Sequence, residues 1–349
     1  MSRRKKLPLL LLLPLLGLAA PAQAQEAPLK VSVGLGDVSL TKLIFIVAYD
    51  AGIYKKNGLD VAHYIDPRAA EVVKRSGVEV PKEFVRRADG DDVNINIGGG
   101  SPLMVSITSD AKATDRVILA TTDTVSRYHI MANPAVIKTP EDLKGKRIGF
   151  TGVGALTHLM LNVYARKMGW DARKDISLIA NGTGVEPMKS GKVDASAADE
   201  IARVNLAKAG YTDLVDLNKD QIAMAGSGIN AERKWLNANR EAARRFVKSA
   251  VEATALAKTD KKVAFSALQK WYGITDPQRL EEIYADIVKL TPKPYPAVDG
   301  IKTVMEIYDY REMTKHKPQD FYDASFVEEL DKSGYIDSLY KGTSGAAKD

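Results

Sequence analysis

The sequence predicts an α/β protein with two lobes and a helical C-terminal region. Three observations support this prediction. Short apolar runs typical of strands alternate with helical patterns over residues 29–229. Two of these strands continue through a glycine-rich turn into a helix, at 92–107 and at 139–170. From residue 237 onward the chain is helical almost throughout. Strands that alternate with helices are typical of short parallel-sheet units.

Residues 139–170 form the clearest of these units. A strand is expected at 147–150, a turn with the sequence Thr-Gly-Val-Gly at 151–154, and a helix from 156 that Gly169 is placed to end. At such a turn, backbone N–H groups and the positive end of the helix dipole converge, which suits an anionic group. An ordinary α/β connection has the same pattern, so both interpretations stay open.

Residues 92–107 repeat this arrangement. Val93, Ile95 and Ile97 alternate as a strand, and three consecutive glycines at 98–100 make the turn. Ser101 is a favourable N-cap and Pro102 a favourable first helical residue. Because consecutive glycines cost backbone entropy, they indicate that another group approaches this backbone closely. The alternative is a merely tight turn.

The remaining elements follow from the same patterns. The other strands are expected at 29–33, 59–64, 117–122, 128–131, 176–179 and 193–197, with extended segments at 214–217 and 222–229. The other helices are expected at 40–48, 185–190, 201–209, 239–258, 261–272, 277–289, 298–314 and 324–333, with shorter patterns around 69–75 and 82–87.

Two connections suggest how the chain divides into lobes. The segments 121–131 and 214–229 bracket one α/β block. If both are crossovers, residues 25–124 together with 222–349 form one lobe and residues 125–221 form the other. The glycine turns would then face a cleft at the carboxyl ends of the strands.

The N-terminal segment has the pattern of a secretory signal peptide. Four basic residues at 3–6 precede an apolar run at 7–20 and an Ala-Gln-Ala cleavage site that ends at Ala24. We therefore expect residues 1–24 to be removed on export. Loss of these four basic residues lowers the formal net charge from +6 to about +2, so nucleic acid is a poor candidate partner.

The sequence gives little support to catalytic, metal-binding or cofactor-binding sites of the common types. The chain has no cysteine, which excludes disulfides, thiolate catalysis, cysteine metal sites and lipid attachment. The histidines are not spaced as metal ligands on one helix face, and no Gly-x-Ser-x-Gly motif occurs. The turn at 152–154 resembles the start of a dinucleotide fingerprint, but Thr157 stands where the third glycine belongs. We therefore expect no cofactor, no metal and no enzyme.

Several motifs resemble those of a known family. They are IGGGSPL at 97–103, KTPEDLKGKRIG at 138–149, Thr157-His158, GKVDA at 191–195, SFV at 325–327 and SGYID at 333–337. Through these motifs the chain resembles the periplasmic solute-binding proteins of ABC importers, of the nitrate/sulfonate/taurine type, over essentially its whole mature length. The resemblance implies a type II periplasmic-binding-protein fold, in which two lobes joined by two crossover segments close on a ligand.

The resemblance also implies where the ligand binds. Its acidic group would be held by the turn after the first glycine-rich strand and by the helix start in the second lobe. The first loop is expected to contribute as well. Carried over to this sequence, the implied site residues are Asp37, Ser39, Gly99, Gly100, Ser101, Gly152, Gly154, Ala155, Leu156 and Thr157.

Two departures from the family pattern disfavour a small sulfonate. The strand at 193–197 is followed by Ala-Asp-Glu-Ile rather than by an aromatic residue and a proline, and the second-lobe turn has fewer hydroxyl groups. Arg127, at the first crossover, either pairs with a ligand carboxylate in bidentate fashion or is a solvated charge. Glu200 either accepts a hydrogen bond from a ligand amine or hydroxyl, or stabilises the dipole of its own helix.

The sequence therefore predicts an extracytoplasmic, periplasmic receptor that captures a small anionic organic solute of the sulfonate or carboxylate type. It would deliver this solute to an ABC permease in the inner membrane, and we expect it to be a monomer. Taurine, nitrate and pyrimidine-like solutes remain candidates. The alternatives are the receptor of a TRAP-type transporter and an enzyme of the related pyrimidine-synthesis type, which requires a cysteine cluster that this chain lacks.

Overall fold

The structure is a computed structural model. It describes residues 27–36, 39–65, 67, 70, 71, 74, 82–85, 93–98, 104, 115–124, 127–226 and 228–341. The predicted signal peptide and four of the predicted site residues, Asp37, Gly99, Gly100 and Ser101, lie outside the described residues.

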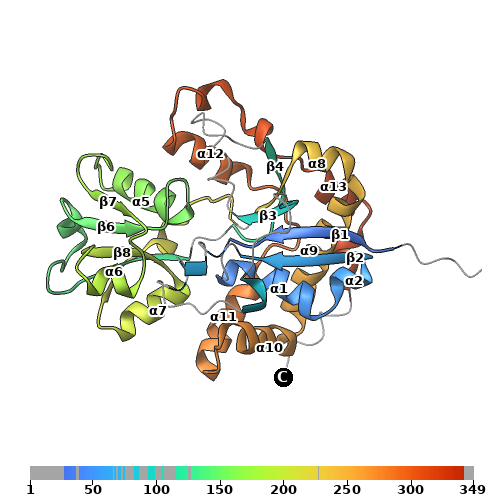
Figure 1. Ribbon diagram of the computed structural model, residues 1–349, viewed down its shortest axis with the longest axis horizontal. Coiled ribbons are helices and arrows are strands. Elements are labelled where there is room, and N and C mark those ends of the chain that lie inside the picture. Colours follow the sequence, from blue (N-terminus) through green and yellow to red (C-terminus); the bar gives the residue numbers. More distant parts are fainter. Residues whose placement is uncertain are drawn as a thin grey trace, which may run out of the picture.

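The described strands form two five-stranded sheets in separate halves of the molecule (Figure 1). The first sheet has the order β2-β1-β3-β10-β4, and the second has the order β7-β6-β8-β5-β9. The first consists of β1 (Leu29–Gly34), β2 (Leu59–Tyr64), β3 (Ile95–Gly98), β4 (Arg116–Thr121) and β10 (Gly228–Glu232). The second consists of β5 (Tyr128–Ala132), β6 (Arg147–Phe150), β7 (Ser177–Ala180), β8 (Ala195–Asp199) and β9 (Thr212–Asp216).

Both sheets are mixed, so the expectation of parallel sheet units was incomplete. β1 pairs in parallel with β2 and β3, and β6 pairs in parallel with β7 and β8. β10 is antiparallel to β3 and β4, and β5 is antiparallel to β8 and β9. The physical reason is the crossover. β5 and β10 are the first strands after the chain passes from one half to the other, and each enters its sheet from the opposite end.

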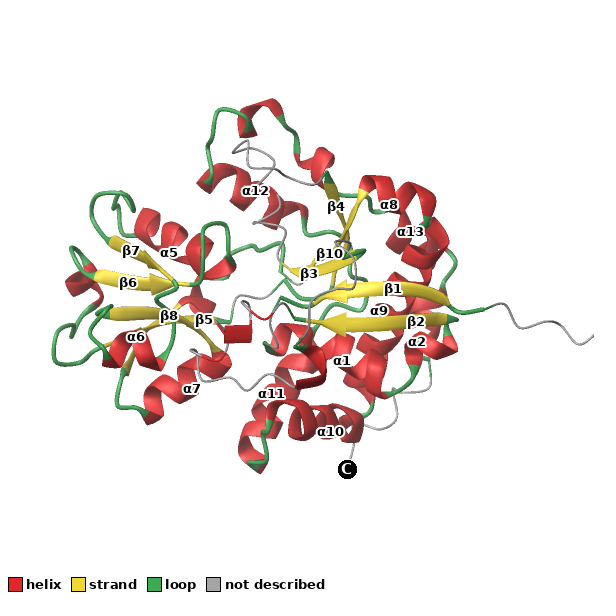
Figure 2. Cartoon of the chain, viewed as in Figure 1, coloured by secondary structure: helices red, strands yellow, loops and turns green. Residues whose placement is uncertain are grey.

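Helices surround both sheets, and most of the C-terminal helices lie around the first (Figure 2). We call each sheet with its helices the first and the second lobe. The α-helices whose full bounds are described are α1 (Leu43–Asp50), α2 (Ile53–Lys56), α5 (Leu156–Lys167), α6 (Val185–Lys189), α7 (Glu200–Lys208), α8 (Arg233–Ala238), α9 (Arg240–Thr259), α10 (Lys261–Tyr272), α11 (Pro277–Lys289), α12 (Val298–Ile307), α13 (Ser325–Lys332) and α14 (Tyr335–Ser338). Short 3-10 helices include η1 (Leu40–Lys42) and η4 (Leu217–Asp220).

The core of the first lobe is built around α1 and α9. The sequence of α1 is apolar on all sides, so six of its residues are buried. Small alanine side chains along α9 let α1 pack closely against it. Phe246 of α9 stacks on Phe45 of α1 and on Tyr54 of α2, with ring centroids 6.1 Å and 5.4 Å apart. This packing fixes the surface from which α1 and α11 face the second lobe.

The expected helix at 298–314 is shorter in the structure, where α12 ends at Ile307. Tyr308 turns inward there and is buried beside His158 of α5, with ring centroids 5.5 Å apart. Burial of this ring ends the helix, and only a 3-10 turn at Met313–Lys315 follows. As a result, α12 packs against α5 of the second lobe.

The two crossovers lie against each other at backbone distance. Gly226, in the second crossover, has a φ of +45°, and a Cβ atom placed on it would lie 1.3 Å from the carbonyl oxygen of Asp123 in the first crossover. Gly300 of α12 approaches the same segment, because a Cβ atom on it would lie 2.0 Å from the carbonyl carbon of Met224. Only glycine permits both contacts. Among the described residues, no helix is both long enough and apolar enough to cross a membrane.

Candidate ligand-binding cleft

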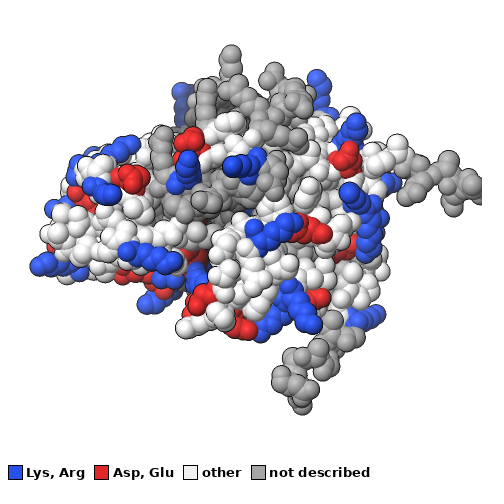
Figure 3. Space-filling view, turned by 60° about the horizontal axis from the view of Figure 1, so that its bottom comes forward, with Lys and Arg blue, Asp and Glu red and all other residues white. Residues whose placement is uncertain are grey.

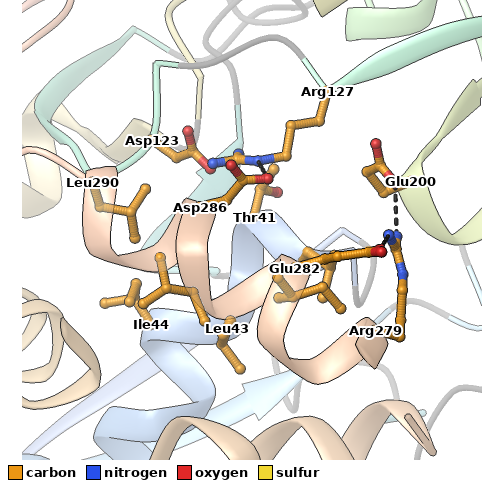
Figure 4. A pocket seen from close by; sticks show the side chains of 13 residues that line it. Thr41, Leu43, Ile44, Asp123, Arg127, Glu200, Arg279, Glu282, Asp286 and Leu290 are labelled. Carbon is orange, nitrogen blue, oxygen red and sulfur yellow. Dashed lines mark hydrogen bonds and ion pairs between the residues drawn. The ribbon is translucent and has the colours of Figure 1, made fainter. Parts of the chain in front are cut away.

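A cavity of about 60 Å³ lies where the two lobes and the first crossover meet (Figure 4). η1 and α1 line it on one side and one face of α11 lines it on another. The lining residues of α11 lie at i, i+3, i+4, i+7 and i+8 from Arg279, which explains why they share a face. The lining residues are Leu40, Thr41, Leu43, Ile44, Asp123, Arg127, Glu200, Arg279, Glu282, Ile283, Asp286, Ile287 and Leu290.

A smaller hollow of about 20 Å³ shares residues with this cavity, and we call the two together the cleft cavity. The hollow is lined by Ser39, Leu40, Thr41, Arg127, Tyr128, Asp199, Glu200 and Ile201. It therefore brings together three predicted site residues from distant parts of the chain, namely Ser39, Arg127 and Glu200. The assignment of these residues to ligand binding stays a prediction.

Arg127 is held between two carboxylates. Its Nη1 atom contacts a carboxylate oxygen of Asp123, and its Nε atom lies 3.9 Å from Asp286 of α11. The side chains of Arg127 and Asp123 are only 13% and 7% exposed. Arg127 is thus a largely buried, paired cation and not a solvated charge. A ligand carboxylate would have to compete with the two aspartates.

Glu200 is the most heavily engaged carboxylate of the cleft cavity. It lies 3.1 Å from Nε2 of His129, 3.3 Å from Arg203 and 2.7 Å from Arg279 of α11. Burial alone would raise its pKa, but the hydrogen bonds from His129 and Arg279 and the two guanidinium charges lower its pKa to about 2. Glu200 is therefore ionised at any physiological pH.

His129 of β5 contacts Glu200 from within the second lobe. Its Nδ1 atom lies 3.0 Å from a carboxylate oxygen of Asp213, so a protonated ring can donate to a carboxylate at each nitrogen. Burial alone would lower the pKa of His129, but Glu200 and Asp213 together raise its pKa above the ordinary value. The result is a network of alternating charges inside the second lobe.

The N-terminus of α7 is capped by its own chain. The carboxylate of Asp199 accepts hydrogen bonds from the backbone N–H groups of Ile201 and Ala202, at 3.0 Å and 2.8 Å. These donors, which a bound anion would otherwise use, are occupied.

The turn between β6 and α5 lies apart from the cleft cavity. None of the predicted residues Gly152, Gly154, Ala155, Leu156 and Thr157 lines it. Several N–H groups of the turn are bonded internally: that of Thr151 donates to the Thr157 hydroxyl, that of Ala155 to the Gly152 carbonyl, and that of Gly154 to His158. Their role in binding stays a prediction.

His158 ties this turn to α12. Its Nδ1 atom lies 2.7 Å from the Tyr308 hydroxyl and 3.3 Å from the Gly154 nitrogen, so an unprotonated Nδ1 accepts from both. Burial lowers the pKa of His158, which favours this neutral form. The ring also stacks on Phe150, with centroids 4.7 Å apart. His158 therefore has a structural role in the described part of the chain.

Three residues of α11 were missed in the sequence analysis, namely Arg279, Glu282 and Asp286. Their spacing beside buried Leu280, Ile283 and Ile287 shows that they border the core-facing side of the helix. The sequence carries no signal that this border faces the second lobe, because the helix lies in the C-terminal region, far from the glycine turns. Among the described residues, no cluster of three or more His, Asp or Glu side chains is placed to hold a metal.

Comparison with known proteins identifies the fold. Residues 110–264 match the family model described as NMT1/THI5 like, and no curated protein matches. The periplasmic aliphatic sulphonate-binding protein SsuA from Escherichia coli superposes with a TM-score of 0.58 at 19% identity, over 85% of this chain and 99% of SsuA. The periplasmic nitrate-binding protein NrtA from Synechocystis PCC 6803 superposes with a TM-score of 0.62 at 14% identity, over 92% of this chain and 89% of NrtA.

The chain has the type II periplasmic-binding-protein fold. The resemblance to periplasmic binding proteins, predicted from the motifs, is confirmed at the level of the fold, and the family model matches less than half of the chain. The same fold also occurs in an enzyme: the desulfurization enzyme DSZB superposes with a TM-score of 0.56 at 13% identity, over 87% of this chain and 99% of DSZB.

Proposed function

We propose that this protein is a periplasmic receptor that captures a small organic solute between its two lobes and delivers it to an ABC importer. The observation that carries this proposal is the cleft cavity, because its lining comes from both lobes and from the first crossover. A solute seated there would contact both halves and favour their closure. We retain the lobe boundaries 25–124 with 222–349 and 125–221, and the signal peptide at 1–24, as parts of the proposal.

The charge of the cleft cavity narrows the chemistry of the solute. Its described lining contains four carboxylates, those of Asp123, Glu200, Glu282 and Asp286, and two guanidinium groups, those of Arg127 and Arg279. A bare anion would be repelled by this surplus of negative charge. The volume of about 60 Å³ accommodates a single functional group or a few water molecules.

We therefore propose a solute with two different ends. A hydrogen-bond-donating or cationic group, such as an amine, would enter the cleft cavity and meet its carboxylates. An acidic group would be held by Gly99, Gly100 and Ser101, as the resemblance implies. Such a solute keeps the anionic character predicted from the sequence, and it explains the carboxylates that the sequence analysis did not anticipate.

Binding rather than catalysis is the proposed role. Glu200 is a poor proton acceptor near neutral pH because its pKa is about 2. Arg127 and Arg279 are each paired with carboxylates. These groups are suited to hold a closed cleft and not to transfer protons.

A ligand screen tests the proposed function. The mature protein, freed of co-purified solute, would be tested by thermal shift and then calorimetry against aminosulfonates, amino acids and aminopyrimidines, with matched sulfonates and carboxylates that lack the amine. We expect stabilisation by a solute with a donor group, by about 2.7 kcal/mol at a concentration of 100 Kd, and recovery of the solute unchanged.

Two results of this screen would contradict the proposal. Equal binding of the solutes with and without the amine would show that the carboxylates of the cleft cavity do not select the solute. Conversion of a bound solute into a product would show that the protein is an enzyme.

A further inference from the structure

An ion pair joins the two lobes across the cleft cavity, between two helices that are distant in the sequence. Glu200 begins α7 of the second lobe, and Arg279 lies in the first turn of α11 of the first lobe. Arg279 Nη2 lies 2.7 Å from Glu200 Oε2, and the two side chains are only 21% and 18% exposed (Figure 4). At this distance and burial, the pair is a charge-assisted hydrogen bond.

Glu200 is held in place by its own lobe. His129 of β5 lies 3.1 Å from one carboxylate oxygen, and Arg203, one turn further along α7, lies 3.3 Å from the other. His129 is in turn oriented by Asp213 of β9, at 3.0 Å. These contacts all lie within the second lobe, so they persist whatever the position of the first lobe.

Arg279 is likewise held by its own lobe. Glu282, one turn along α11, lies 3.1 Å from Arg279 Nη1. The backbone N–H of Arg279 donates to the carboxylate of Asp276, the N-cap of α11, at 2.8 Å. Buried Leu280 and Ile283 anchor the same helix turn in the first-lobe core. Both partners are therefore positioned before they meet, which reduces the side-chain entropy lost when the pair forms.

We propose that Glu200 and Arg279 form a latch that holds the two lobes in the closed arrangement, with Arg279 as a positioning residue that acts through Glu200. Rotation of the lobes about the crossovers would separate α7 from α11 and break this pair. Glu200 would then keep His129 and Arg203, and Arg279 would keep Glu282. Because neither charge is left buried and unpaired, the latch can open without the large penalty of breaking an isolated buried pair.

The latch is a contact between the two lobes themselves, whereas the contacts of the proposed function are made with the solute. It acts without a solute, and it sets the fraction of molecules that are closed before binding. A receptor that is partly closed binds its solute with an apparent affinity scaled by the fraction in the binding-competent state. The latch can therefore be tested in the solute-free protein, and its test does not depend on the identity of the solute.

The absence of cysteine makes a direct distance measurement possible. Cysteines would replace Lys189 at the end of α6 and Lys262 in α10, two exposed positions in different lobes, and carry spin labels for distance measurements by double electron–electron resonance. The variants are Arg279→Gln, Arg279→Lys and, as a matched control, Arg244→Gln. Arg244 also contacts two carboxylates, Glu241 and Glu329, but both belong to its own lobe.

We expect the closed-to-open ratio to fall at least fivefold in Arg279→Gln, which corresponds to about 1 kcal/mol. Arg279→Lys should fall between this variant and the unsubstituted protein, because lysine keeps the charge but loses the planar geometry of the guanidinium. Arg244→Gln should leave the distance distribution unchanged.

Circular dichroism would confirm that each variant is folded. A distance distribution in Arg279→Gln that matches that of Arg244→Gln would overturn the latch. If Arg279→Gln does not fold, the comparison is made with Arg279→Lys, and a distribution equal to that of Arg244→Gln overturns the proposal in the same way. Failure of the solute screen with a shifted distribution would refute the proposed ligand and not the latch.

Discussion

Gly226 shows how a single residue controls the junction between the lobes. Its backbone has a φ of +45°, which disfavours any residue with a side chain, and the carbonyl oxygen of Asp123 occupies the space where a Cβ atom would lie. Gly210 also has a positive φ, of +89°, but nothing lies within 4 Å of its Cβ position. A side chain at Gly210 would meet only the conformational penalty of a positive φ, whereas a side chain at Gly226 would meet this penalty and a steric clash as well.

We predict that Gly226→Ala lowers the free energy of unfolding by about 3 kcal/mol or more, because it adds a backbone clash to the conformational penalty. Gly210→Ala should cost only about 1–2 kcal/mol, since it carries the conformational penalty alone. Urea unfolding of both variants measures the difference. Equal losses of unfolding free energy in the two variants would show that the crossovers move apart to admit the new methyl group without a loss of stability.

At the scale of elements, Arg127 connects the first crossover to α11. It contacts Asp123 within the crossover and lies 3.9 Å from Asp286 on the helix. Loss of the guanidinium would leave the carboxylate of Asp123, which is 7% exposed, without this cation. Arg173 serves as the control, because it forms an arginine–aspartate ion pair with Asp309 at 3.8 Å and its side chain is 76% exposed.

We predict that Arg127→Ala lowers the free energy of unfolding by about 2–3 kcal/mol in the absence of any solute, because a largely buried ion pair is broken. Arg173→Ala should change stability by less than about 0.5 kcal/mol, as exposed pairs contribute little. Thermal unfolding of the two variants compares them directly. A small effect of Arg127→Ala, combined with loss of solute binding, would instead assign Arg127 to ligand recognition.

At the scale of the whole molecule, the surface carries charges of both signs (Figure 3). Basic and acidic side chains are interspersed over the face shown in Figure 3, which agrees with the near-neutral charge expected of the mature chain.

In the interior, His63 is a group through which the stability of the protein should depend on pH. His63 lies in the first-lobe core among the rings of Tyr49, Tyr54 and Phe84. Complete burial lowers the pKa of His63 to about 3.

Acidification should therefore destabilise the protein through His63. Its pKa is 6.5 when unfolded and about 3 when folded, so below pH 6.5 the unfolded state binds a proton that the folded state does not. The contribution of the neutral ring is fully present above pH 6.5 and falls by up to about 1.4 kcal/mol per pH unit between pH 6.5 and 3. His129, whose pKa is raised, acts in the opposite sense, since its contribution is lost as pH rises through its folded pKa.

We predict that lowering the pH from 7 to 5 costs about 2 kcal/mol through His63, and that His63→Phe removes most of this loss. His316→Gln, a change at a partly exposed histidine, is the control for the loss of a histidine outside this core. Urea unfolding midpoints at the two pH values give the comparison. An unchanged acid response in His63→Phe would place the sensitivity elsewhere.

Local patterns in the sequence were sufficient for most of the elements and for the fold class. The expected helices at 261–272 and 277–289 coincide with α10 and α11, because capping residues and apolar spacing act within a few turns of one another. The motifs also predicted the resemblance to periplasmic binding proteins. The direction of β5 and β10 was not predicted, since strand direction depends on how the chain crosses between the lobes.

The cleft cavity required the tertiary structure. Glu200 and Arg279 are 79 positions apart, and nothing near either residue in the sequence indicates its partner. Arg127 pairs with Asp123, four residues earlier in the same crossover, but its second carboxylate neighbour, Asp286, lies on a helix of the C-terminal region that the sequence does not place beside it. Periodicity determines which face of a helix is buried, but the pairing of charges depends on which faces the fold brings together.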